Sequence, residues 1–533
     1  MVTVKRALLS CADKTGLDAF AKELTTLGVE LVASGGTADF LKAQGLPVKT
    51  VETFAGITEQ LDGRVKTLHP KIHAGILARR DNPAHVQSVG AGGLIDLVVV
   101  NLYPFAHTVR QPGRSLGDVI EQIDVGGVAL LRAAAKNFQH VASVCEPRQY
   151  GEVLAALRAG RGQLPEALTH QLAVEAFEVT SRYDTLIAEF LGSPRSNLLE
   201  RGEQNSHAAS SQAQPGASAL PDQTAATVRK RQALRYGENP HQRGGWYVSS
   251  SGSPWGLGTL RQLQGKELSY NNFLDVDAAL RCLLEFTEPT CVIVKHTMPC
   301  GVASASPVTL AYDRAYACDP ESAFGGIVGI NQPVDQGLAE HLVSTFLEVV
   351  LAPSVEPAAA GILANKPNLR VVILTWPAKR PAELQWRHLL GGWLLQDPDL
   401  QMETADALKL ATKRAPTEPE RADLLFAWKT AKHAASNSIV LVRDRATVGI
   451  GQGQPSRVAS VRLALQHAGE RSKGSVAASD GFFPFPDSVE WLARAGVRAV
   501  IQPGGSIRDA EVVAAADAAN LAMVFTGIRH FRH

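Results

Sequence analysis

The sequence lacks an excess of charge of either sign, and it is poor in cysteine. Its 53 Lys and Arg residues face 52 Asp and Glu residues, which leaves a formal net charge of +1. No overall field therefore attracts nucleic acid or an anionic membrane. The six cysteines are scattered and contain no C-x-x-C pair, a usage typical of a reducing compartment rather than of a disulfide framework. We expect a cytoplasmic protein with no nucleic-acid partner.

Long apolar runs are also missing. No stretch approaches the ~20 residues of a membrane-spanning helix, and the first residues, Met1–Arg6, contain no apolar signal-peptide core. We therefore expect no membrane association. Hydrophobic residues make up 45% and charged residues 20% of the chain, as in globular proteins. Because 533 residues exceed what one core organises, we expect at least two domains.

Two cofactor motifs are incomplete. The run from Gly449 to Gln454 resembles a dinucleotide fingerprint, but Gln454 stands where the third glycine belongs. No complete fingerprint with an acid about twenty residues further on is found, which argues against a nicotinamide oxidoreductase. The run from His296 to Cys300 resembles a zinc deaminase site, yet Met298 replaces the general-acid Glu and no second Cys follows at C-x-x-C spacing. We expect no catalytic metal.

A compositional break divides the chain. From about Ser193 to Thr227 the sequence is rich in Ser, Ala, Gln, Gly and Pro, with almost no large apolar residue. Such a segment cannot bury enough surface to offset its ordering entropy, so it predicts a linker or mobile insertion. We expect three regions: a first domain over residues 1–195, the linker over 196–228, and a second domain over 229–533.

The first region alternates between strand and helix signals. Apolar runs at Ala7–Ser10, Val29–Ala33 and Asp96–Asn101 predict strands, the last of the buried parallel type. Apolar residues recur at helical spacing from Leu17 to Leu24, and Ser34–Thr37 predicts a turn before another helix. This order predicts a doubly wound α/β domain, whose ligands bind at the carboxyl ends of the strands.

Candidate anion-binding groups gather at those strand ends. The run from Arg64 to His73 interleaves cationic and imidazole side chains with apolar ones, which is atypical of a solvated charge run. The Ser34–Thr37 turn opens a helix, whose N-terminus can hold a phosphate, although such a turn alone is more often only a tight turn. Further polar groups accompany it and together indicate an enzyme acting on a phosphorylated metabolite: Ser10, Lys14, Asn101, Tyr103, Asp124 and Lys136.

Longer motifs occur in both regions. In the first region these motifs are Arg64–Leu77, Asn101–Phe105, Asp124–Gly127 and Arg132–Asn137. The second domain carries Leu234–Gln242, Ser269–Asn272, Val294–His296, Ser322–Gly326, Ser436–Ser438, Gln454–Arg457, Phe482–Phe485, Gln502–Ser506 and Gly527–His533. These motifs resemble the bifunctional family that combines aminoimidazole carboxamide ribonucleotide (AICAR) transformylase with inosine monophosphate (IMP) cyclohydrolase. They follow the family's order and span nearly the whole chain outside the linker.

The resemblance implies the last two steps of de novo purine biosynthesis. A formyl group passes from 10-formyltetrahydrofolate to AICAR, and the product then closes its ring to IMP with loss of water. The resemblance places the cyclohydrolase in a methylglyoxal-synthase-like doubly wound domain over residues 1–195. It places the transformylase in residues 229–533, built from two cytidine-deaminase-like subdomains. It further implies a homodimer that shares its transformylase sites, no catalytic metal, and at most a structural monovalent cation.

For formyl transfer, the resemblance assigns the chemistry to Lys295 and His296. The AICAR amine is a poor nucleophile, so the reaction needs a base for its proton and a donor for the formyl oxyanion. The resemblance implies that His296 is a base or proton relay, and that Lys295 polarises the formyl oxygen or protonates the departing folate nitrogen. The matched nucleotide contacts are Arg235, Tyr236, Asn272, Gly325, Glu348, Asn437, Arg457, Phe482 and Arg529, and the matched folate contacts are Val458, Asp487, Ser506 and Ile507.

For ring closure, the protein must remove an amide proton and steady an oxyanion, while proximity within the folded nucleotide lowers much of the barrier. The resemblance assigns these tasks to Lys66, Tyr103, Asp124 and, foremost, Lys136. A lysine such as Lys136 is by itself more often a solvated helix residue. The matched substrate contacts are Ser10, Lys14, Ser34, Gly35, Gly36, Thr37, Arg64, Thr67 and Asn101.

Three departures from the family pattern bear on rate. Ala12, Phe138 and Met298 stand where relatives commonly carry Ser, His and Asn. Met298 lies two residues from His296 and therefore bears on formyl transfer. An alternative interpretation of the first region is a regulatory nucleotide-binding module, which needs phosphate contacts but no catalytic set. We also expect the extreme C-terminus to be docked, because Arg529 belongs to the matched site.

Overall fold

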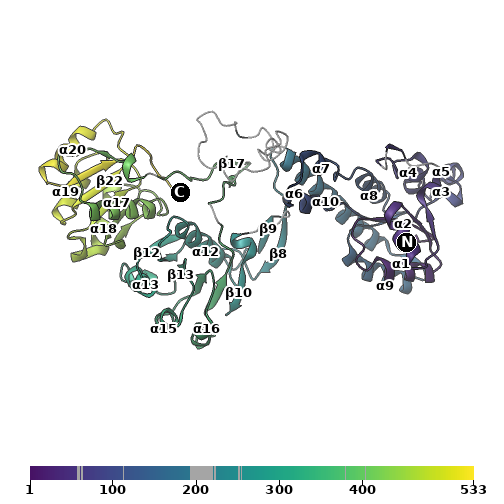
Figure 1. Ribbon diagram of the computed structural model, residues 1–533, viewed down its shortest axis with the longest axis horizontal. Coiled ribbons are helices and arrows are strands. Elements are labelled where there is room, and N and C mark those ends of the chain that lie inside the picture. The colour runs from purple at the N-terminus through teal and green to yellow at the C-terminus, as the bar shows by residue number, and fades with distance from the viewer. Residues whose placement is uncertain are drawn as a thin grey trace. The chain divides into compact units, whose positions relative to one another are not determined.

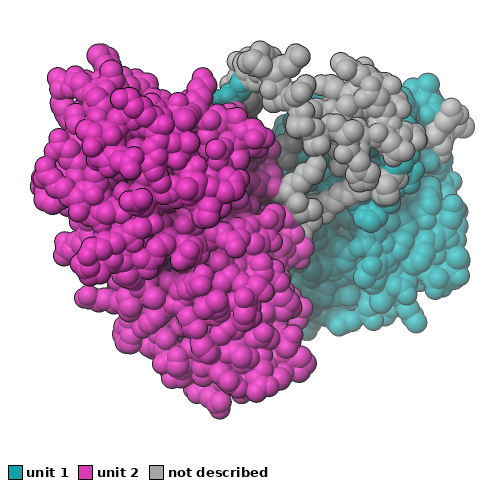
Figure 2. All heavy atoms as spheres, turned by 60° about the vertical axis from the view of Figure 1, so that its left-hand side comes forward, with its two compact units in different colours: residues 1–227 teal, residues 228–533 magenta. Residues whose placement is uncertain are grey.

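The structure is a computed structural model that describes residues 1–56, 60–61, 64–111, 113–191, 220, 224–249, 253, 255–377, 380–402 and 404–533. The chain forms two compact units, residues 1–227 and 228–533 (Figures 1 and 2). The linker predicted over 196–228 lies outside the described residues, apart from Leu220 and residues 224–228. None of the helices in the described part of the chain is both long and apolar enough to span a bilayer.

Unit 1 is built on a five-stranded sheet in which every neighbouring pair is parallel. Such a sheet needs helical crossovers, because parallel strands cannot be joined by short turns. The prediction of a doubly wound domain is confirmed. In sheet order the strands are β4 (Val48–Thr50), β3 (Glu30–Ala33), β2 (Arg6–Cys11), β5 (Leu97–Asn101) and β6 (Ala142–Val144).

Helices cover both faces of this sheet because its central strands are apolar on both sides. In β2, Leu8 and Leu9 are fully buried in two different core clusters, one on each face. Each buried leucine contributes about 1.5–3 kcal/mol. The helices are α1 (Leu17–Thr26), α2 (Gly35–Ala43), α3 (Val51–Ala55), α4 (Pro70–Leu77), α5 (Pro83–Val89), α6 (Phe105–Arg110), α7 (Leu116–Ile120), α8 (Gly126–Lys136), α9 (Tyr150–Ala159) and α10 (Glu166–Leu191).

The Ser34–Thr37 prediction needs one correction. We expected a turn ahead of a helix, but Ser34 is itself the N-cap and α2 already begins at Gly35. The strand β3 ends at Ala33, so it passes into the helix with no intervening loop. The residues of the motif therefore form the first helical turn, whose backbone N–H groups point out of the helix N-terminus.

Unit 2 is built on one twelve-stranded sheet that consists of two halves with the same topology. Each half has an antiparallel hairpin, then three parallel strands, then a short antiparallel edge strand. The halves meet where Ala303 pairs with Ala446. In chain order the strands are β10 (Arg261–Gln264), β11 (Thr290–Lys295), β12 (Met298–Ser304), β13 (Ile327–Ile330), β14 (Val349–Ala352) and β15 (Arg370–Ile373), then β18 (Lys409–Leu410), β19 (Ile439–Arg443), β20 (Ala446–Gly451), β21 (Val476–Ser479), β22 (Ala499–Gln502) and β23 (Ala522–Phe525).

Helices α12 and α17 pack into one core cluster that spans both halves of the sheet and contains the fully buried Trp428. The other helices of unit 2 pack into two further clusters, one in each half (Figure 1). Two hairpins lie outside the sheet: β8 (Val228–Leu234) with β9 (Gly244–Ser249), and β16 (Gln385–Leu389) with β17 (Gly392–Gln396). The helices are α12 (Tyr270–Leu283), α13 (Val308–Tyr316), α14 (Pro320–Ala323), α15 (Gln336–Ser344), α16 (Pro357–Leu363), α17 (Glu418–Ala431), α18 (Arg457–Ala468), α19 (Asp487–Arg494) and α20 (Asp509–Ala518).

Candidate active sites

In unit 1, hydroxyl and ammonium groups converge where β2 and β3 end. Ser34 Oγ donates to Ser10 Oγ at 2.8 Å, and Lys14 Nζ lies 3.3 Å from Thr37 Oγ1. The open side of this cluster is Gly36, because a Cβ placed there would meet no atom within 4 Å. A helix N-terminus flanked by hydroxyls and a lysine suits a phosphate.

The Arg64–Thr67 segment brings a second cation to the same place. A Cβ placed on Gly35 would lie 3.3 Å from Lys66 Nζ, so the ammonium sits against the first turn of α2. On the other side, a Cβ on Gly126 would approach Thr67 Oγ1 to 2.7 Å. Lys66 and Thr67 therefore connect the N-terminus of α2 with the N-terminus of α8.

Asp124 lies at the start of α8 and is partly buried. Its Oδ1 accepts a hydrogen bond of 2.7 Å from the backbone N–H of Gly127, and its own N–H donates to Tyr183 Oη at 2.8 Å. Burial raises the pKa of Asp124, and hydrogen bonds from the backbone N–H groups of Gly127 and Tyr103 counteract part of that rise. A carboxyl group with a raised pKa at the edge of a polar site is a recurrent feature of acid–base catalysis.

Four other assigned residues of unit 1 have a less direct relation to these polar groups: Tyr103, Asn101, Arg64 and Lys136. Tyr103 is half-exposed and adjoins Asp124 through its backbone, and Asn101 binds the backbone of Asp13 at 2.7 and 3.0 Å. Arg64 is exposed and forms an ion pair with Glu121. Lys136 is the last residue of α8, about 15 Å along the helix from its first residue. Among the described residues no contact joins Lys136 to Asp124.

In unit 2, Lys295 ends β11, and His296 begins the tight turn that joins β11 to β12. Lys295 pairs with Met298 across the hairpin, and the two turn residues, His296 and Thr297, have φ values of 54° and 64°. Positive φ at both positions is the geometry of a two-residue hairpin turn of type I′. Lys295 Nζ donates to the carbonyl of Phe324 at 2.9 Å, so the turn presents a held lysine beside an exposed imidazole.

Asp275 holds this turn, and sequence analysis missed it. Its carboxylate accepts hydrogen bonds from the backbone N–H groups of His296, at 3.3 Å, and Thr297. Burial raises the pKa of Asp275, and these two hydrogen bonds counteract part of that rise. The available signal was its position on α12, one helical turn after Asn272 and therefore on the same face.

Thiol chemistry is not available beside this turn. Burial raises the pKa of Cys300 to about 12, so the nearby thiol is protonated at neutral pH. Among the described residues, no three or more His, Cys, Asp or Glu side chains are grouped in a way that could hold a metal ion.

The second half of unit 2 contains a cavity of about 490 Å³. Five residues that the sequence assigned to nucleotide or folate binding meet there, two of them at the starts of α18 and α19. Phe482 and Phe485 line it while Phe483 is fully buried, so only one of the three rings is core. The lining residues are Asn437, Pro455, Ser456, Arg457, Val458, Phe482, Pro484, Phe485, Asp487, Ser488 and Phe531.

Arg457 is the fixed cation of this cavity. Its side chain is 6% exposed and forms an ion pair with the fully buried Asp480. Arg457 Nη2 also donates to Asn437 Oδ1 at 2.7 Å. A buried guanidinium that is held by a carboxylate and an amide is preorganised for recognition of a polar ligand. The side chains of Arg457 and Asn437 therefore form a rigid polar part of the cavity wall.

The remaining predicted residues lie outside that cavity. Arg235 and Tyr236 follow β8 and form a stacked, hydrogen-bonded pair at 2.8 Å. Asn272 closes a capping box with Ser269, and Glu348 forms an ion pair with Arg370 at 2.5 Å. The other four positions are exposed or half-exposed: Gly325 with φ 71°, Ser506, the fully exposed Ile507, and Arg529, whose guanidinium stacks on Phe531.

The C-terminal residues are docked, as expected. The N–H of His530 donates to the carbonyl of Asp480 at 3.2 Å, and the carbonyl of Arg532 accepts from the N–H of Ser436 at 2.9 Å. These bonds tie the tail to the loop that carries Asn437. As a result Phe531 reaches the cavity wall.

Two family models match parts of this chain. Residues 134–467 match the family described as the AICARFT/IMPCHase bienzyme, and residues 16–129 match the MGS-like domain. The bifunctional purine biosynthesis protein PurH of Cyanothece sp. (strain PCC 7425 / ATCC 29141) is 49% identical over 531 residues, covering 99% of each chain. A solved structure titled "Crystal structure of ForH" is 36% identical and covers 35% of this chain and 97% of its own, with a TM-score of 0.33.

The family match covers more than half of the chain, and the relative is similar along almost all of it. The MGS-like match lies wholly within unit 1, and the match to the bienzyme family begins in unit 1 at residue 134 and continues into unit 2. The chain belongs to the AICARFT/IMPCHase bienzyme family.

Proposed function

We propose that the two activities of this family are divided between the two units, with ring closure in residues 1–195 and formyl transfer in residues 229–533. As a bifunctional AICAR transformylase and IMP cyclohydrolase, the chain catalyses the final steps of purine biosynthesis. The observation that carries the division is the presence of two separately built polar sites, one around Lys66 and Asp124 and one around the Lys295–His296 turn.

In formyl transfer, the amine of AICAR attacks the formyl carbon of 10-formyltetrahydrofolate, and the bond from that carbon to the folate nitrogen breaks. His296 takes the amine proton, directly or by relay, and Lys295 donates to the formyl oxygen or to the leaving nitrogen. The contact from Lys295 to a backbone carbonyl supports this role, since it fixes the ammonium beside the turn. Asp275 holds the turn itself.

In ring closure, the carboxamide nitrogen of formyl-AICAR attacks the formyl carbon and water leaves. Lys66 steadies the oxyanion and Asp124 takes the amide proton, with Tyr103 beside it. The proximity of Lys66 to Gly35 supports a position next to the bound phosphate. For Lys136 the support is the family motif alone, because its side chain is exposed at the other end of α8.

The binding residues follow the same division. In unit 1 the phosphate lies at the N-terminus of α2 between Ser10 and Lys14, and the ribose lies toward Arg64 and Asn101. In unit 2 the folate occupies the cavity at Asp487 and Val458, next to the nucleotide at Arg457. The chemistry is assigned to side chains alone, and any monovalent cation has a structural role. The remaining assigned contacts are Ser34, Gly35, Gly36, Thr37, Thr67, Arg235, Tyr236, Asn272, Gly325, Glu348, Asn437, Phe482, Ser506, Ile507 and Arg529.

We also propose a cytoplasmic homodimer that shares its transformylase sites. The six cysteines are unpaired, as in a reducing compartment. The β16–β17 hairpin exposes Trp393, Leu394 and the fully exposed Leu390, and contiguous exposed apolar surface is typical of a protein interface. Sedimentation of Leu390→Glu tests this: we expect a shift toward monomer and loss of formyl transfer. An unchanged sedimentation coefficient would contradict a role of the hairpin in dimerisation.

Two partial reactions measured on the full chain test the division. We expect Lys66→Ala and Asp124→Asn to lose conversion of formyl-AICAR to IMP while they keep formyl transfer from the folate to AICAR. His296→Ala gives the reverse pattern. Loss of both activities in a properly folded single variant would refute separate sites. Full cyclohydrolase activity in Lys66→Ala and Asp124→Asn would favour the regulatory alternative for unit 1.

A further inference from the structure

The tail that ends the chain alternates between the core and the cavity. His530 is 2% exposed, and its ring packs at a centroid distance of 5.0 Å on the buried Trp428. On either side of it, Phe531 lines the cavity and Arg529 stacks on Phe531 at 4.6 Å. The buried imidazole therefore lies between Phe531, which lines the cavity, and Arg529, which stacks on Phe531 outside the cavity lining.

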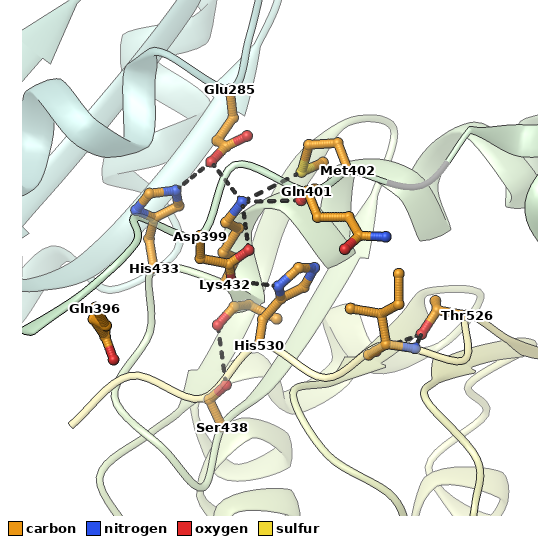
Figure 3. A network of polar contacts seen from close by, with 12 residues as sticks. Glu285, Gln396, Asp399, Gln401, Met402, Lys432, His433, Ser438, Thr526 and His530 are labelled. Atoms are coloured by element: carbon orange, nitrogen blue, oxygen red, sulfur yellow. Dashed lines mark hydrogen bonds and ion pairs between the residues drawn. The ribbon is translucent and has the colours of Figure 1, made fainter. Parts of the chain in front are cut away.

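His530 is held by a carboxylate from a distant segment. Its Nδ1 lies 2.6 Å from Asp399 Oδ2, and Lys432 Nζ lies 3.4 Å from Asp399 Oδ1 (Figure 3). Lys432 in turn donates to the carbonyl of Gln401 at 3.1 Å and lies 3.7 Å from Glu285. Asp399 is thus the one carboxylate in Figure 3 that contacts both the tail, at His530, and the C-cap of α17, at Lys432, with one oxygen for each.

The burial of these groups makes their pairing costly to break. The side chains of Glu285 and Lys432 are 1% and 5% exposed, and the carboxylate of Glu285 also contacts Arg380 and His433. Buried charges persist only when they are paired and hydrogen-bonded. Asp399, at 44% exposure, lies at the open end of the network, so it can be changed with the smallest disturbance of the core.

We propose that Asp399 is a positioning residue for formyl transfer. It fixes the imidazole of His530, and this contact sets Arg529 and Phe531 against the site where the nucleotide binds. The inference rests on the proposed function, in which Arg529 contacts AICAR. It adds a requirement outside the reacting groups: nucleotide binding depends on a carboxylate that touches neither substrate.

Steady-state kinetics of the full-length enzyme test this. In Asp399→Ala we expect the KM for AICAR to rise about tenfold, with kcat for formyl transfer within about threefold of wild type, because a binding contact is displaced rather than a catalytic one. Asp399→Asn keeps an acceptor for Nδ1 and is expected to stay within about threefold in KM. The matched control is Asp397→Ala, two residues away and exposed, with no change. Cyclohydrolase activity of the same preparations reports folding of unit 1.

A KM for AICAR within about twofold of wild type in Asp399→Ala would overturn the inference, as would a fall in kcat with unchanged KM. If Asp399→Ala does not fold, the test moves to the other partner. His530→Asn places an amide nitrogen where Nδ1 was, and His530→Ala removes it. We expect the KM to rise only in His530→Ala, and equal KM values in the two would overturn the inference.

Arg529→Ala separates this inference from the proposed function. If Arg529→Ala leaves the KM for AICAR unchanged, the assigned nucleotide contact is wrong and the inference falls with it. If Arg529→Ala raises the KM and Asp399→Ala does not, only the positioning role fails.

Discussion

In each half of unit 2 an aspartate on a helix holds a tight hairpin turn, but the two turns carry different side chains. In the first half, Asp275 on α12 accepts backbone N–H groups of the β11–β12 turn, at His296 and Thr297. In the second half, Asp423 on α17 accepts those of the β19–β20 turn, from Asp444 at 2.9 Å and Arg445 at 2.7 Å. All four turn residues have φ between 53° and 64°.

The comparison separates the residues that hold a turn from the side chains that the turn presents for chemistry. Both carboxyl groups have pKa values raised by burial and lowered in part by the turn N–H groups. Only the first turn carries a Lys-His pair; its counterpart runs Arg443-Asp444-Arg445. A non-glycine residue with positive φ is conformationally costly, so an aspartate that stabilises two of them is a structural requirement in both halves. The catalytic difference then lies in the side chains that the turn presents.

The largest expected effect separates the two turns directly. His296→Ala removes the proposed base, and we expect kcat for formyl transfer to fall at least about a hundredfold. Asp444→Ala, at the equivalent position of the other turn, is the control and is expected to retain activity. Formation of formyl-AICAR from AICAR and 10-formyltetrahydrofolate is the assay. Retained transfer in His296→Ala would remove that residue from the mechanism.

Changing the aspartates sharpens the comparison. Asp275→Ala and Asp423→Ala each leave two turn N–H groups without their carboxylate, so we expect similar losses of unfolding free energy, about 1–3 kcal/mol. Only Asp275→Ala is expected to lower kcat for formyl transfer, about tenfold, because it releases His296. Urea unfolding and steady-state kinetics measure the two quantities. Equal kinetic losses in both variants would mean that the turns do not differ in function.

The pH dependence gives a smaller effect. Burial raises the folded-state pKa of Asp275 and Asp423 above the ordinary value of 3.8. In the window between that value and the raised pKa, the folded state holds more protons than the unfolded state, so stability falls as pH rises. We expect Asp275→Asn and Asp423→Asn each to flatten this slope in urea titrations. An unchanged slope in both would contradict the raised pKa values.

The smallest effect concerns Met298, which departs from the family pattern. Its backbone closes the hairpin opposite Lys295 and its side chain is only partly buried. Met298→Asn therefore leaves the turn intact, and we expect kcat and KM for formyl transfer to change less than about threefold. A tenfold gain in kcat would show instead that Met298 removes a polar contact from the reaction.

Periodicity predicted the strands and the parallel sheet of unit 1, because these depend on local sequence. Long-range pairings were not predictable. Asp275 and Asp399 act through contacts with residues far along the chain. For Asp275 the one local signal was its helical spacing from Asn272, and for Asp399 no local pattern marks a carboxylate that binds a distant tail. Likewise, the motif match identified Lys136 but not its distance from Asp124, which is set by the length of α8.

The central claim is that each unit binds a nucleotide monophosphate at its own polar site. A crystal structure of the full-length enzyme grown with IMP tests it most directly. We predict phosphate density at the N-terminus of α2, within hydrogen-bonding distance of Ser10 and Lys14, with Lys66 Nζ beside the ligand. A structure in which IMP binds only in unit 2, leaving that helix terminus without ligand, would contradict the claim.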